Sequence, residues 1–321
     1  MRPIRPPLRT DAPPAERAAQ LWTYRRDLER YWKLQPLPGA GKDGVLPLSP
    51  RGRVVTGLLR MLGLADRGWR NACTPTLLDL SFRFAALPER LDGLRILHLS
   101  DLHYPPAAED YATAVSDLVS GLEVDLCVLT GDYRFGRRTQ PAAAMARLAD
   151  LIPRIHARHG VFATLGNHDL CEMVGDLRVM GITVLVNEGL QVDADGLPLW
   201  IAGVDDPHMF RCADAGAAMA GAPRDAFKLF LAHAPESYAE AAALGADLYL
   251  CGHTHAGQVR FPRIGALYAN ARCPIAYAAG EWRHGSMQGY TSAGLGVTEV
   301  PVRFRCPPEA AVITLQRDDR P

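Results

Sequence analysis

The sequence predicts an α/β fold in which layers of strands and helices form one main domain. From about residue 80, short apolar runs alternate with helical stretches, which is typical of sheets that are buried on both faces. Hydrophobic residues make up 48% of the 321 residues and charged residues 22%, as in ordinary globular proteins. The preceding residues have a different, basic composition. We therefore divide the chain into a basic, partly helical N-terminal extension (residues 1–79) and an α/β domain (residues 80–317).

The N-terminal extension contains one clear helical pattern, between Ala15 and Lys33. Apolar residues at Leu21, Tyr24 and Leu28 recur with the spacing of one helix face, and most of the nearby arginines fall on the other faces. Residues 1–14, rich in proline and arginine, are expected to be disordered. A Pro/Gly linker at 35–50 precedes a second apolar stretch, VVTGLLRMLGL at 54–64, which has arginines on both sides.

The charge of the extension allows two arrangements. Residues 1–70 hold fourteen Lys or Arg against six Asp or Glu, a net charge of +8 in a chain that is neutral as a whole. In the first arrangement, residues 15–70 lie on an anionic membrane surface. In the second, both helical segments pack on the α/β domain and their arginines face water. The remainder of the chain is acidic and has no basic, aromatic-rich stripe, which disfavours a nucleic-acid partner.

The same sequence predicts a cytoplasmic protein, either free or peripheral on the inner face of the membrane. The basic N-terminus is not followed by the apolar segment of a secretory signal, and no run of eighteen apolar residues occurs. The seven cysteines are scattered without a CxxC pair. This pattern indicates neither a disulfide framework nor a zinc–thiolate site, and it favours a reducing compartment.

Six apolar runs in the α/β domain are predicted strands. Helical stretches lie near 109–121 and 140–158, between the early strands. Later strands are closely spaced, and turns such as Asp195-Gly196 indicate hairpins and a mixed second sheet. The predicted strands are Leu94–Leu99, Leu126–Thr130, Val161–Leu165, Leu199–Val204, Lys228–Ala232 and Leu248–Cys251.

Five of these strands run into residue types that bind metals. In open α/β sheets, the loops at the carboxyl ends of strands converge on one crevice, so we expect these residues to meet. A single DxH or GD after a strand is more often a turn or a cap, and a lone histidine at a strand end is usually a core residue, whereas GNHD and GHTH are individually more specific. All five together favour a site. The segments are Asp101-Leu102-His103, Gly131-Asp132, Gly166-Asn167-His168-Asp169, His233 and Gly252-His253-Thr254-His255.

The spacing of these residues suits a cation site. In extended backbone, residues i and i+2 point to the same side, so Asp101 and His103 can approach one cation together, as can His253 and His255. Carboxylate and amide oxygens combined with imidazole nitrogens, without thiolates, suit Mn, Fe or Zn. The glycines before Asp132, Asn167 and His253 allow a sharp turn from strand to loop.

These motifs resemble the calcineurin-like metallophosphoesterases, whose signature is DxH, GD, GNH[DE], a lone His and GHxH in that order. The resemblance covers roughly residues 80–317. The longer matches LSDLH, LTGDY, LGNHD and CGHTHAGQV are similar to the bacterial branch that includes membrane-associated and cell-envelope phosphodiesterases. One departure is Ala256, where that branch usually has glycine. The resemblance implies a four-layer α/β/β/α sandwich of two mixed sheets, with a helical N-terminal extension.

The resemblance also implies two adjacent divalent metal ions, Mn, Fe or Zn. It places Asp101, His103 and His255 on the first ion and Asn167, His233 and His253 on the second, with Asp132 bridging them. His168 then faces the substrate as a catalytic residue, and Asp169 orients its imidazole. Hydroxide held by the two ions attacks phosphorus in line, and His168 donates a proton to the leaving oxygen or stabilises the transition state.

Substrate anchors are predicted in two segments. Arg134, Arg137 and Arg138 follow Asp132 in GDYRFGRR and could hold a second phosphate, although a solvated basic turn fits them equally well. Arg303 in PVRF is a similar candidate. Asp205 and Asp206 in GVDDP also follow a strand, and an Asp-Pro turn is the simpler interpretation of them.

The sequence thus predicts a dinuclear-metal-dependent phosphoesterase that hydrolyses a phosphodiester or a pyrophosphate. A nucleotide-linked lipid such as a UDP-diacylglucosamine is a candidate substrate by family analogy. Two alternatives are a protein or small-molecule phosphomonoesterase, and a catalytically inactive binding scaffold. The complete set of metal-ligand residues, together with His168, argues against the inactive scaffold.

Overall fold

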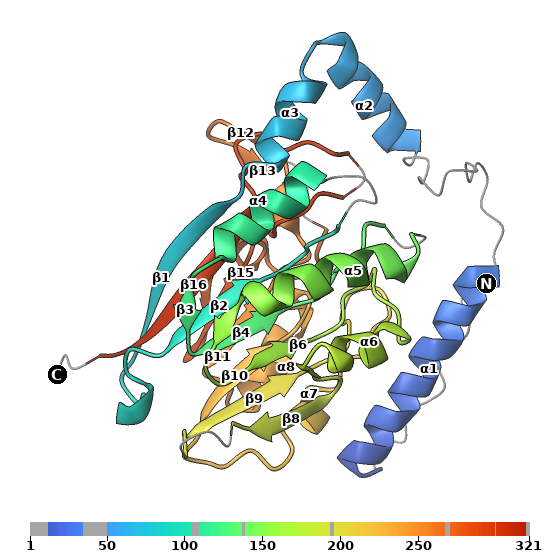
Figure 1. Ribbon diagram of the computed structural model, residues 1–321. Helices are drawn as coiled ribbons and strands as arrows, with labels where there is room; N and C mark the ends of the chain where they lie inside the picture. Colours follow the sequence, from blue (N-terminus) through green and yellow to red (C-terminus); the bar gives the residue numbers. More distant parts are fainter. Residues whose placement is uncertain are drawn as a thin grey trace.

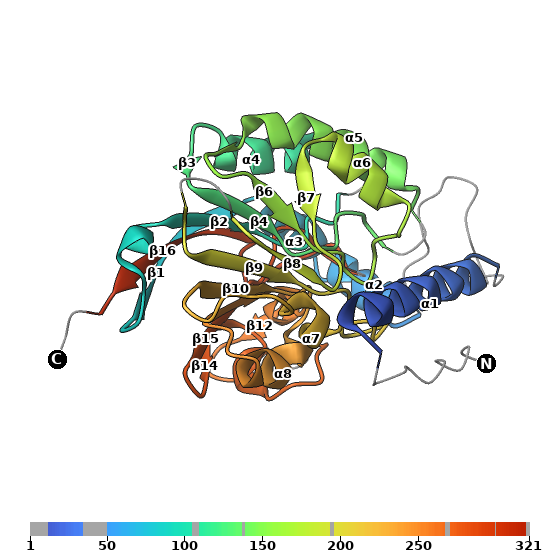
Figure 2. The same cartoon turned by 90° about the horizontal axis from the view of Figure 1, so that it is seen from below.

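Two mixed sheets of six strands each lie face to face at the centre of the structure (Figures 1 and 2). The structure is a computed structural model, and it describes residues 12–34, 50–104, 109–136, 139–192, 196–266, 270–298 and 300–318. Helices cover the outer face of each sheet (Figure 2). The result is the four-layer α/β/β/α arrangement that the sequence predicts.

The first sheet has the strand order β1-β16-β2-β4-β6-β7. The strand at the C-terminal end of the domain, β16, runs antiparallel to β2 and parallel to β1, and the other neighbours are parallel. A hairpin cannot join parallel neighbours, so helices connect the central strands. The strands are β1 (Thr76–Phe84), β2 (Arg95–Leu99), β4 (Leu126–Leu129), β6 (Val161–Ala163), β7 (Ile182–Val184) and β16 (Glu309–Arg317).

The second sheet has the order β14-β15-β11-β10-β9-β8. Its four central strands are parallel, and antiparallel strands close both edges: β8 pairs with β9, and β14 pairs with β15. The strands are β8 (Glu188–Gln191), β9 (Leu199–Gly203), β10 (Phe227–Leu231), β11 (Leu248–Cys251), β14 (Gly280–His284) and β15 (Met287–Thr291).

Three apolar layers hold this sandwich together. Residues such as Ile96 and Val128 of the first sheet and Leu229 and Leu250 of the second fill the space between the sheets. A second layer lies between the first sheet and the helices α4 (Glu109–Val119), α5 (Pro141–Leu151) and α6 (Met173–Val179). The third lies between the second sheet and α7 (Ala215–Ala218) and α8 (Tyr238–Ala243).

All six predicted strands are present close to their predicted bounds. The predicted helix at 140–158 is shorter than expected. It ends at Leu151 and continues as the 3₁₀ turn η2 (Ile152–Arg154), because Pro153 has no N–H to continue the helical hydrogen bonds. The remaining short elements are β3 (Glu123–Val124), β5 (His156–Ala157), β12 (Arg260–Phe261), β13 (Gly265–Ala266), η1 (Glu89–Leu91), η3 (Pro235–Ser237), η4 (His255–Gly257) and η5 (Ile275–Tyr277).

The predicted N-terminal helix is α1 (Pro14–Leu34), and it packs against the domain. Leu21 and Leu28 are buried in a cluster with Phe210. Arg25, one of the arginines that would face water in the second arrangement of the sequence analysis, is fully buried. Arg25 lies four residues after Leu21 and three before Leu28, so it is on the same docked face of the helix, over the ring of Phe210 and beside polar main-chain groups of the domain.

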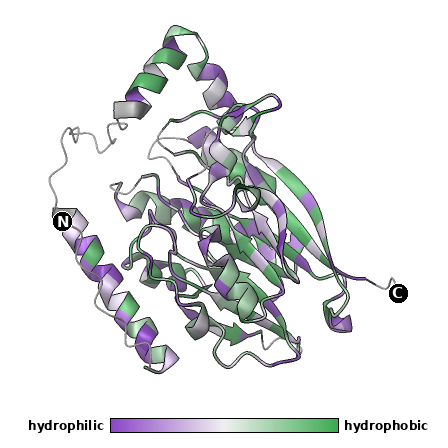
Figure 3. Ribbon diagram, turned by 180° about the vertical axis from the view of Figure 1, so that it is seen from behind, coloured by the Kyte–Doolittle hydropathy of each residue, from purple (hydrophilic) through white to green (hydrophobic). Residues whose placement is uncertain are grey.

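The second apolar stretch forms α2 (Pro50–Met61), which lies at the periphery of the structure and is joined to the body through α3 (Ala65–Ala72) (Figure 1). A Cβ on Gly68 of α3 would clash with Val302, so this helix lies close against the 302–304 segment. Apolar residues of α2 are exposed: Val54 by 72% and Met61 by 76%. Figure 3 shows apolar positions along this helix in green.

No helix among the described residues is long and apolar enough to span a membrane. β1 begins at Thr76, slightly before the predicted domain boundary. The division into residues 1–79 and 80–317 stays a prediction. The proposed disordered segment 1–14 and the linker 35–50 lie almost entirely outside the described residues, as does Asp195 of the predicted hairpin turn.

Candidate metal centre

The five predicted loops meet at one edge of the sandwich. The loops after β2, β4 and β6 come from the first sheet, and those after β10 and β11 come from the second. Because both sheets present the carboxyl ends of these strands at the same edge, side chains far apart in the sequence converge there. The seven predicted ligand residues are all buried: Asp101, His103, Asp132, Asn167, His233, His253 and His255.

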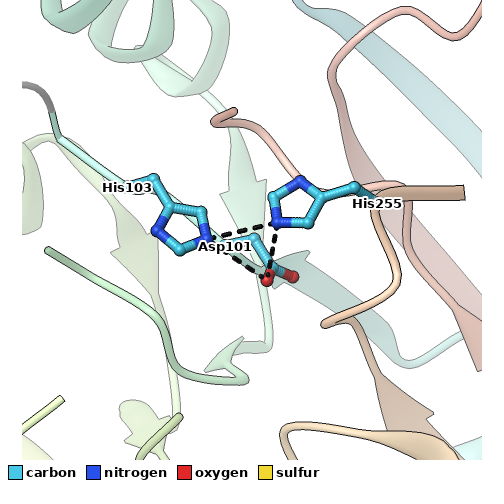
Figure 4. A group of neighbouring side chains, drawn as sticks. All are labelled: Asp101, His103 and His255. Atoms are coloured by element: carbon cyan, nitrogen blue, oxygen red, sulfur yellow. Dashed lines mark hydrogen bonds and ion pairs between the residues drawn. The ribbon is translucent and has the colours of Figure 1, made fainter. Parts of the chain in front are cut away.

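The first group of donors consists of Asp101, His103 and His255 (Figure 4). The Nε2 atoms of His103 and His255 are 3.2 Å apart. Asp101 Oδ1 lies 3.4 Å from His255 Nε2 and 3.8 Å from His103 Nε2. These three side chains could therefore hold one metal ion.

The second group is built around His233. Its Nε2 lies 2.9 Å from Asn167 Oδ1 and 3.1 Å from His253 Nδ1. Burial, together with the neighbouring His233 and His208, lowers the pKa of His253 well below its ordinary value. A neutral imidazole is the form that binds metals, so this environment favours a ligand.

Asp132 lies between the two groups. Its Oδ2 is 3.4 Å from His103 Nε2 in the first group and 3.3 Å from His233 Nε2 in the second. Burial acts to raise the pKa of Asp132, but the positive charge that His233 and His168 can carry outweighs it and holds this pKa well below its ordinary value. Asp132 is thus an ionised carboxylate that faces both groups at once.

The donor atoms fit cations better than they fit each other. His103 Nδ1 lies 3.0 Å from the carbonyl oxygen of Arg134, and His233 Nδ1 lies 2.8 Å from that of Thr130. A carbonyl can only accept, so each Nδ1 donates its proton and each Nε2 is left facing the centre. Asp101 Oδ1 is buried and has no hydrogen-bond partner among the residues that the structure describes. Such a cluster of acceptors needs positive charge, from protonated histidine or from bound cations.

His233 shows this need directly. Burial lowers its pKa, yet the carboxylates of Asp132 and Asp101 raise the pKa to about 10. The same negative potential that would retain a proton on His233 attracts a divalent ion. The residues present therefore suit a metal centre made of oxygen and imidazole ligands.

The backbone of the site is strained in a way that directs these side chains. Five of the seven predicted ligand residues have positive φ, a region that non-glycine residues rarely occupy. Ala256, next to His255, also has positive φ, of 45°. The five residues are Asp101 (φ 52°), His103 (φ 40°), Asp132 (φ 58°), His253 (φ 71°) and His255 (φ 51°).

Two glycines allow the loops to approach so closely. A Cβ on Gly166 would clash with the Asp132 carboxylate, and one on Gly252 would clash with Ser100 and Asp101. The glycines that the sequence analysis linked to a sharp exit from each strand thus also provide space for the neighbouring carboxylates.

His168, the predicted catalytic residue, lies at the rim of the site. Its side chain is 17% exposed, and its Nε2 is 3.9 Å from Asp132 Oδ2. Its ring lies edge-on to that of His103, with centroids 4.8 Å apart. His168 is therefore close to the donor groups and accessible from solvent.

Asp169 does not have the position that the sequence analysis gave it. We expected its carboxylate beside the His168 imidazole. Instead, its two oxygens accept main-chain N–H bonds from Asp132 (2.7 Å), Tyr133 (2.9 Å) and Gly166 (2.8 Å). It therefore braces the loops after β4 and β6 against each other.

Two of the four predicted substrate anchors, Arg134 and Arg303, lie among the described residues. Arg134 is buried and donates from Nε to the carbonyl of His168, and from Nη1 to that of Thr139 at 2.6 Å. Arg303 is also buried, and its guanidinium donates to main-chain carbonyls of Ala293 and Gly296. Both arginines hold loops of the site, a role that the sequence analysis did not predict. Arg137 and Arg138 lie outside the described residues.

Sequence reasoning missed two polar clusters next to the site. The ring of His208 lies 4.1 Å from that of His253, and His208 Nδ1 lies 2.5 Å from Glu236 Oε1. The second cluster contains Arg25 of α1, which contacts the loop of Asn167 and His168.

Asp206 accepts N–H bonds from Met209 and Phe210, which fits the Asp-Pro turn that the sequence predicts.

Comparison with known proteins identifies this arrangement. The sequence profile of the calcineurin-like phosphoesterases matches residues 94–257, the region that carries all five loops. The chain belongs to the calcineurin-like phosphoesterase family. Members of this family are metal-dependent hydrolases of phosphoric esters, so the protein is an enzyme of this class.

Several relatives of the calcineurin-like phosphoesterase are similar over most of its length. Phosphodiesterase YaeI of Escherichia coli is 30% identical over 77% of this chain and 92% of its own. Metallophosphoesterase YkuE of Bacillus subtilis is 28% identical over 78% of this chain and 89% of its own. The UDP-2,3-diacylglucosamine pyrophosphatase LpxG of Chlamydia trachomatis is 36% identical over a shorter part, 33% of this chain and 32% of its own.

Proposed function

We propose that this phosphoesterase uses two divalent cations to hydrolyse a phosphodiester or a pyrophosphate bond. The supporting observation is the position of Asp132, whose Oδ2 lies within 3.4 Å of an imidazole nitrogen in each donor group. A single carboxylate shared in this way suits a pair of neighbouring ions. Asp101, His103 and His255 would hold one ion, and Asn167, His233 and His253 the other.

When bound, such cations lower the pKa of water and neutralise charge that develops on phosphoryl oxygens. The protein supplies the remaining parts. The buried carbonyls of Arg134 and Thr130 fix the tautomers of His103 and His233. His168 is accessible at the rim, and its Nε2 would deliver a proton to the leaving oxygen. The guanidinium of Arg134 donates to the carbonyl oxygen of His168 and so holds His168 in place.

The proposed substrate class rests on the similarity to two phosphoesterases. Similarity to the chlamydial UDP-2,3-diacylglucosamine pyrophosphatase spans 110 residues and supports a nucleotide-linked lipid with a pyrophosphate bond. Similarity to an Escherichia coli phosphodiesterase covers more of the chain and supports a diester. Both are substrates in which two groups flank one phosphoryl centre, and we propose this broader class.

A metal-reconstituted assay tests the proposal. The metal-free protein would receive Mn, Fe or Zn and be offered bis-p-nitrophenyl phosphate, p-nitrophenyl phosphate or a UDP-lipid analogue. We expect metal-dependent turnover that favours the diester or the anhydride, with saturation at two ions per chain. Turnover of the monoester alone would favour a phosphomonoesterase, and saturation at one ion would contradict the two-ion centre.

The His168→Ala variant tests the role of His168. General acid assistance contributes about 10²–10⁴-fold, so kcat for the diester should fall by about that factor while metal content is retained. His156→Ala is the matched control, because His156 is exposed on strand β5, and it should behave as the unmodified protein. Unchanged kcat in His168→Ala would remove this residue from the mechanism.

We also infer that α2 mediates contact with an anionic membrane surface. Its exposed apolar residues Val54, Leu58 and Met61 lie on a peripheral helix, and the exposed side chains of Arg53 and Arg60 are on the same helix. Apolar residues combined with arginines suit a bilayer that carries negative headgroups. This assigns to α2 the membrane contact that the sequence analysis gave to residues 15–70. The predicted cytoplasmic location stays a prediction.

A further inference from the structure

Arg25 is the most deeply placed charged residue of α1. Its side chain is fully buried although it belongs to a helix outside both sheets. All three nitrogens of the guanidinium have partners. Nε donates to Glu29 at 3.0 Å, Nη1 donates to Asp205, and Nη2 donates to the carbonyls of Gly166 at 3.0 Å and Asp169 at 2.9 Å.

The two carbonyls that Arg25 binds flank the most important pair of residues in the β6 loop. Gly166 precedes Asn167, and Asp169 follows His168, so one guanidinium nitrogen holds the loop on both sides of a candidate metal ligand and the candidate proton donor. Glu29 extends the same contact, because its carboxylate accepts the N–H of Cys171 at 3.1 Å.

Arg25 also joins the two sheets of the domain. The β6 loop belongs to the first sheet, whereas Asp205 follows β9 of the second sheet. The guanidinium lies 4.2 Å above the ring of Phe210, which shields it from water. Burial acts to lower the pKa of Arg25, but the carboxylates of Asp205 and Glu29, with smaller contributions from other groups, outweigh it and raise this pKa, so Arg25 stays charged.

We propose that Arg25 is a positioning residue for catalysis and that α1 forms part of the active centre. Its fork fixes the main chain around Asn167 and His168 and so sets where the amide oxygen and the imidazole point. This inference rests on the proposed function, because it assigns a catalytic consequence to the loop. A shift of about 1 Å in a reacting group can cost about 10²-fold in rate, so a fixed loop matters.

Only arginine satisfies this arrangement. The partners lie in different directions, and the planar fork reaches all of them from one buried position. A lysine keeps the charge and could bind Asp205, but its compact ammonium would leave the carbonyls of Gly166 and Asp169 without their donor. Arg25→Lys therefore separates the effect of charge from the effect of loop fixation.

Two variants and one matched control test the inference in the full-length protein. Arg25→Lys and Arg25→Ala remove the fork. Arg17→Lys is the control. Arg17 lies on the same helix as Arg25, but two nitrogens of its guanidinium bind Asp214 instead of the β6 loop. The first measurement is kcat and KM for bis-p-nitrophenyl phosphate. The second, made without metal, is the rate at which iodoacetamide labels half-buried Cys171, with Cys73 as the internal reference.

We expect Arg25→Lys to lower kcat about 10²-fold while KM changes less than about twofold, because misplacement affects the reaction more than binding. Labelling of Cys171 should accelerate about tenfold as the loop loosens. Millimolar guanidinium chloride should restore part of the kcat of Arg25→Ala by filling the vacated site. Arg17→Lys should change none of these quantities.

Three results would overturn the inference: normal kcat in Arg25→Lys, an equal loss in Arg17→Lys, or unchanged Cys171 labelling in the Arg25 variants. If Arg25→Ala does not fold, Arg25→Lys and its labelling rate still decide. If the unmodified protein shows no metal-dependent hydrolysis, the proposed function fails. In that case faster labelling would show only that Arg25 fixes the loop, and its proposed role in catalysis would be withdrawn.

Discussion

The helices α1 and α2 of the basic N-terminal region behave in opposite ways. α1 buries Leu21, Leu28 and the charged Arg25 against the catalytic domain. α2 exposes Leu58 and Met61, lies at the periphery and is joined to the body through its neighbour α3. The composition of the two segments is similar, with apolar residues and arginines in both, so composition alone does not distinguish a docked helix from a peripheral one.

The difference lies in where the polar partners are. Arg25 is buried because the domain offers the carboxylate of Asp205 and two main-chain carbonyls at the position where α1 docks, and Glu29 of α1 itself adds a second carboxylate. A buried charge is tolerated when it is paired and hydrogen-bonded in this way. The exposed apolar side chains of α2 have no such counterpart among the described residues, which favours an external partner.

Among the variants that test this comparison, Asp205→Ala should have the largest effect on the free energy of unfolding. Removing one partner of a buried ion pair costs about 3–5 kcal/mol, because the remaining charge is left uncompensated. The free energy of unfolding of the metal-free protein, measured with urea, should fall by about that amount. Arg17→Ala removes a partly exposed ion pair on the same helix and should cost about 1 kcal/mol or less. Equal losses would show that Arg25 and Asp205 are not a special contact.

A smaller effect should separate the apolar faces of the two helices. Leu28→Ala creates a cavity in the cluster with Phe210 and should lower the free energy of unfolding by about 2–5 kcal/mol. Leu58→Ala on exposed α2 should change it by about 0.5 kcal/mol or less. Thermal and urea unfolding would measure both. A large loss in Leu58→Ala would mean that α2 is packed in solution, and the membrane proposal would lose its basis.

The smallest free-energy change should appear in vesicle binding. We expect full-length protein to co-sediment at low salt with vesicles that contain phosphatidylglycerol, and a double variant with Leu58→Glu and Met61→Glu to bind at least about tenfold more weakly. Turnover of a soluble diester should be unchanged in this variant. Substituting Arg26 and Arg30 of α1 with glutamine provides a charge control. Failure of the unmodified protein to bind would end the membrane proposal.

Much of the fold and of the metal centre could be predicted from the sequence, because they depend on local patterns. Apolar runs mark β2, β4, β6, β9, β10 and β11 at their observed positions. Strands β14 and β15 were not identified, since GEWRH and MQGYT carry too many polar residues to stand out. The seven predicted ligand residues come directly after apolar runs of this sort, and the structure brings these residues together.

Roles that depend on tertiary contacts could not be predicted. Nothing in the sequence near Arg25 indicates that its partners lie about 140–180 residues further along the chain. Asp169 was assigned to the His168 imidazole because it is adjacent in sequence, yet its oxygens bind main-chain N–H groups of two loops. In both cases the three-dimensional arrangement of carbonyls and amides decides the role.

The division of the donor residues between two sheets has a consequence for how such an enzyme can evolve. Each trio of donors includes residues from both sheets, so the apolar layer between the sheets sets the spacing of the whole centre. Interiors are close-packed, and one added or lost methylene is felt. Substitutions at residues such as Leu229 or Val128 would therefore adjust the catalytic geometry as well as stability. Selection would act on that hydrocarbon layer as it does on the active site.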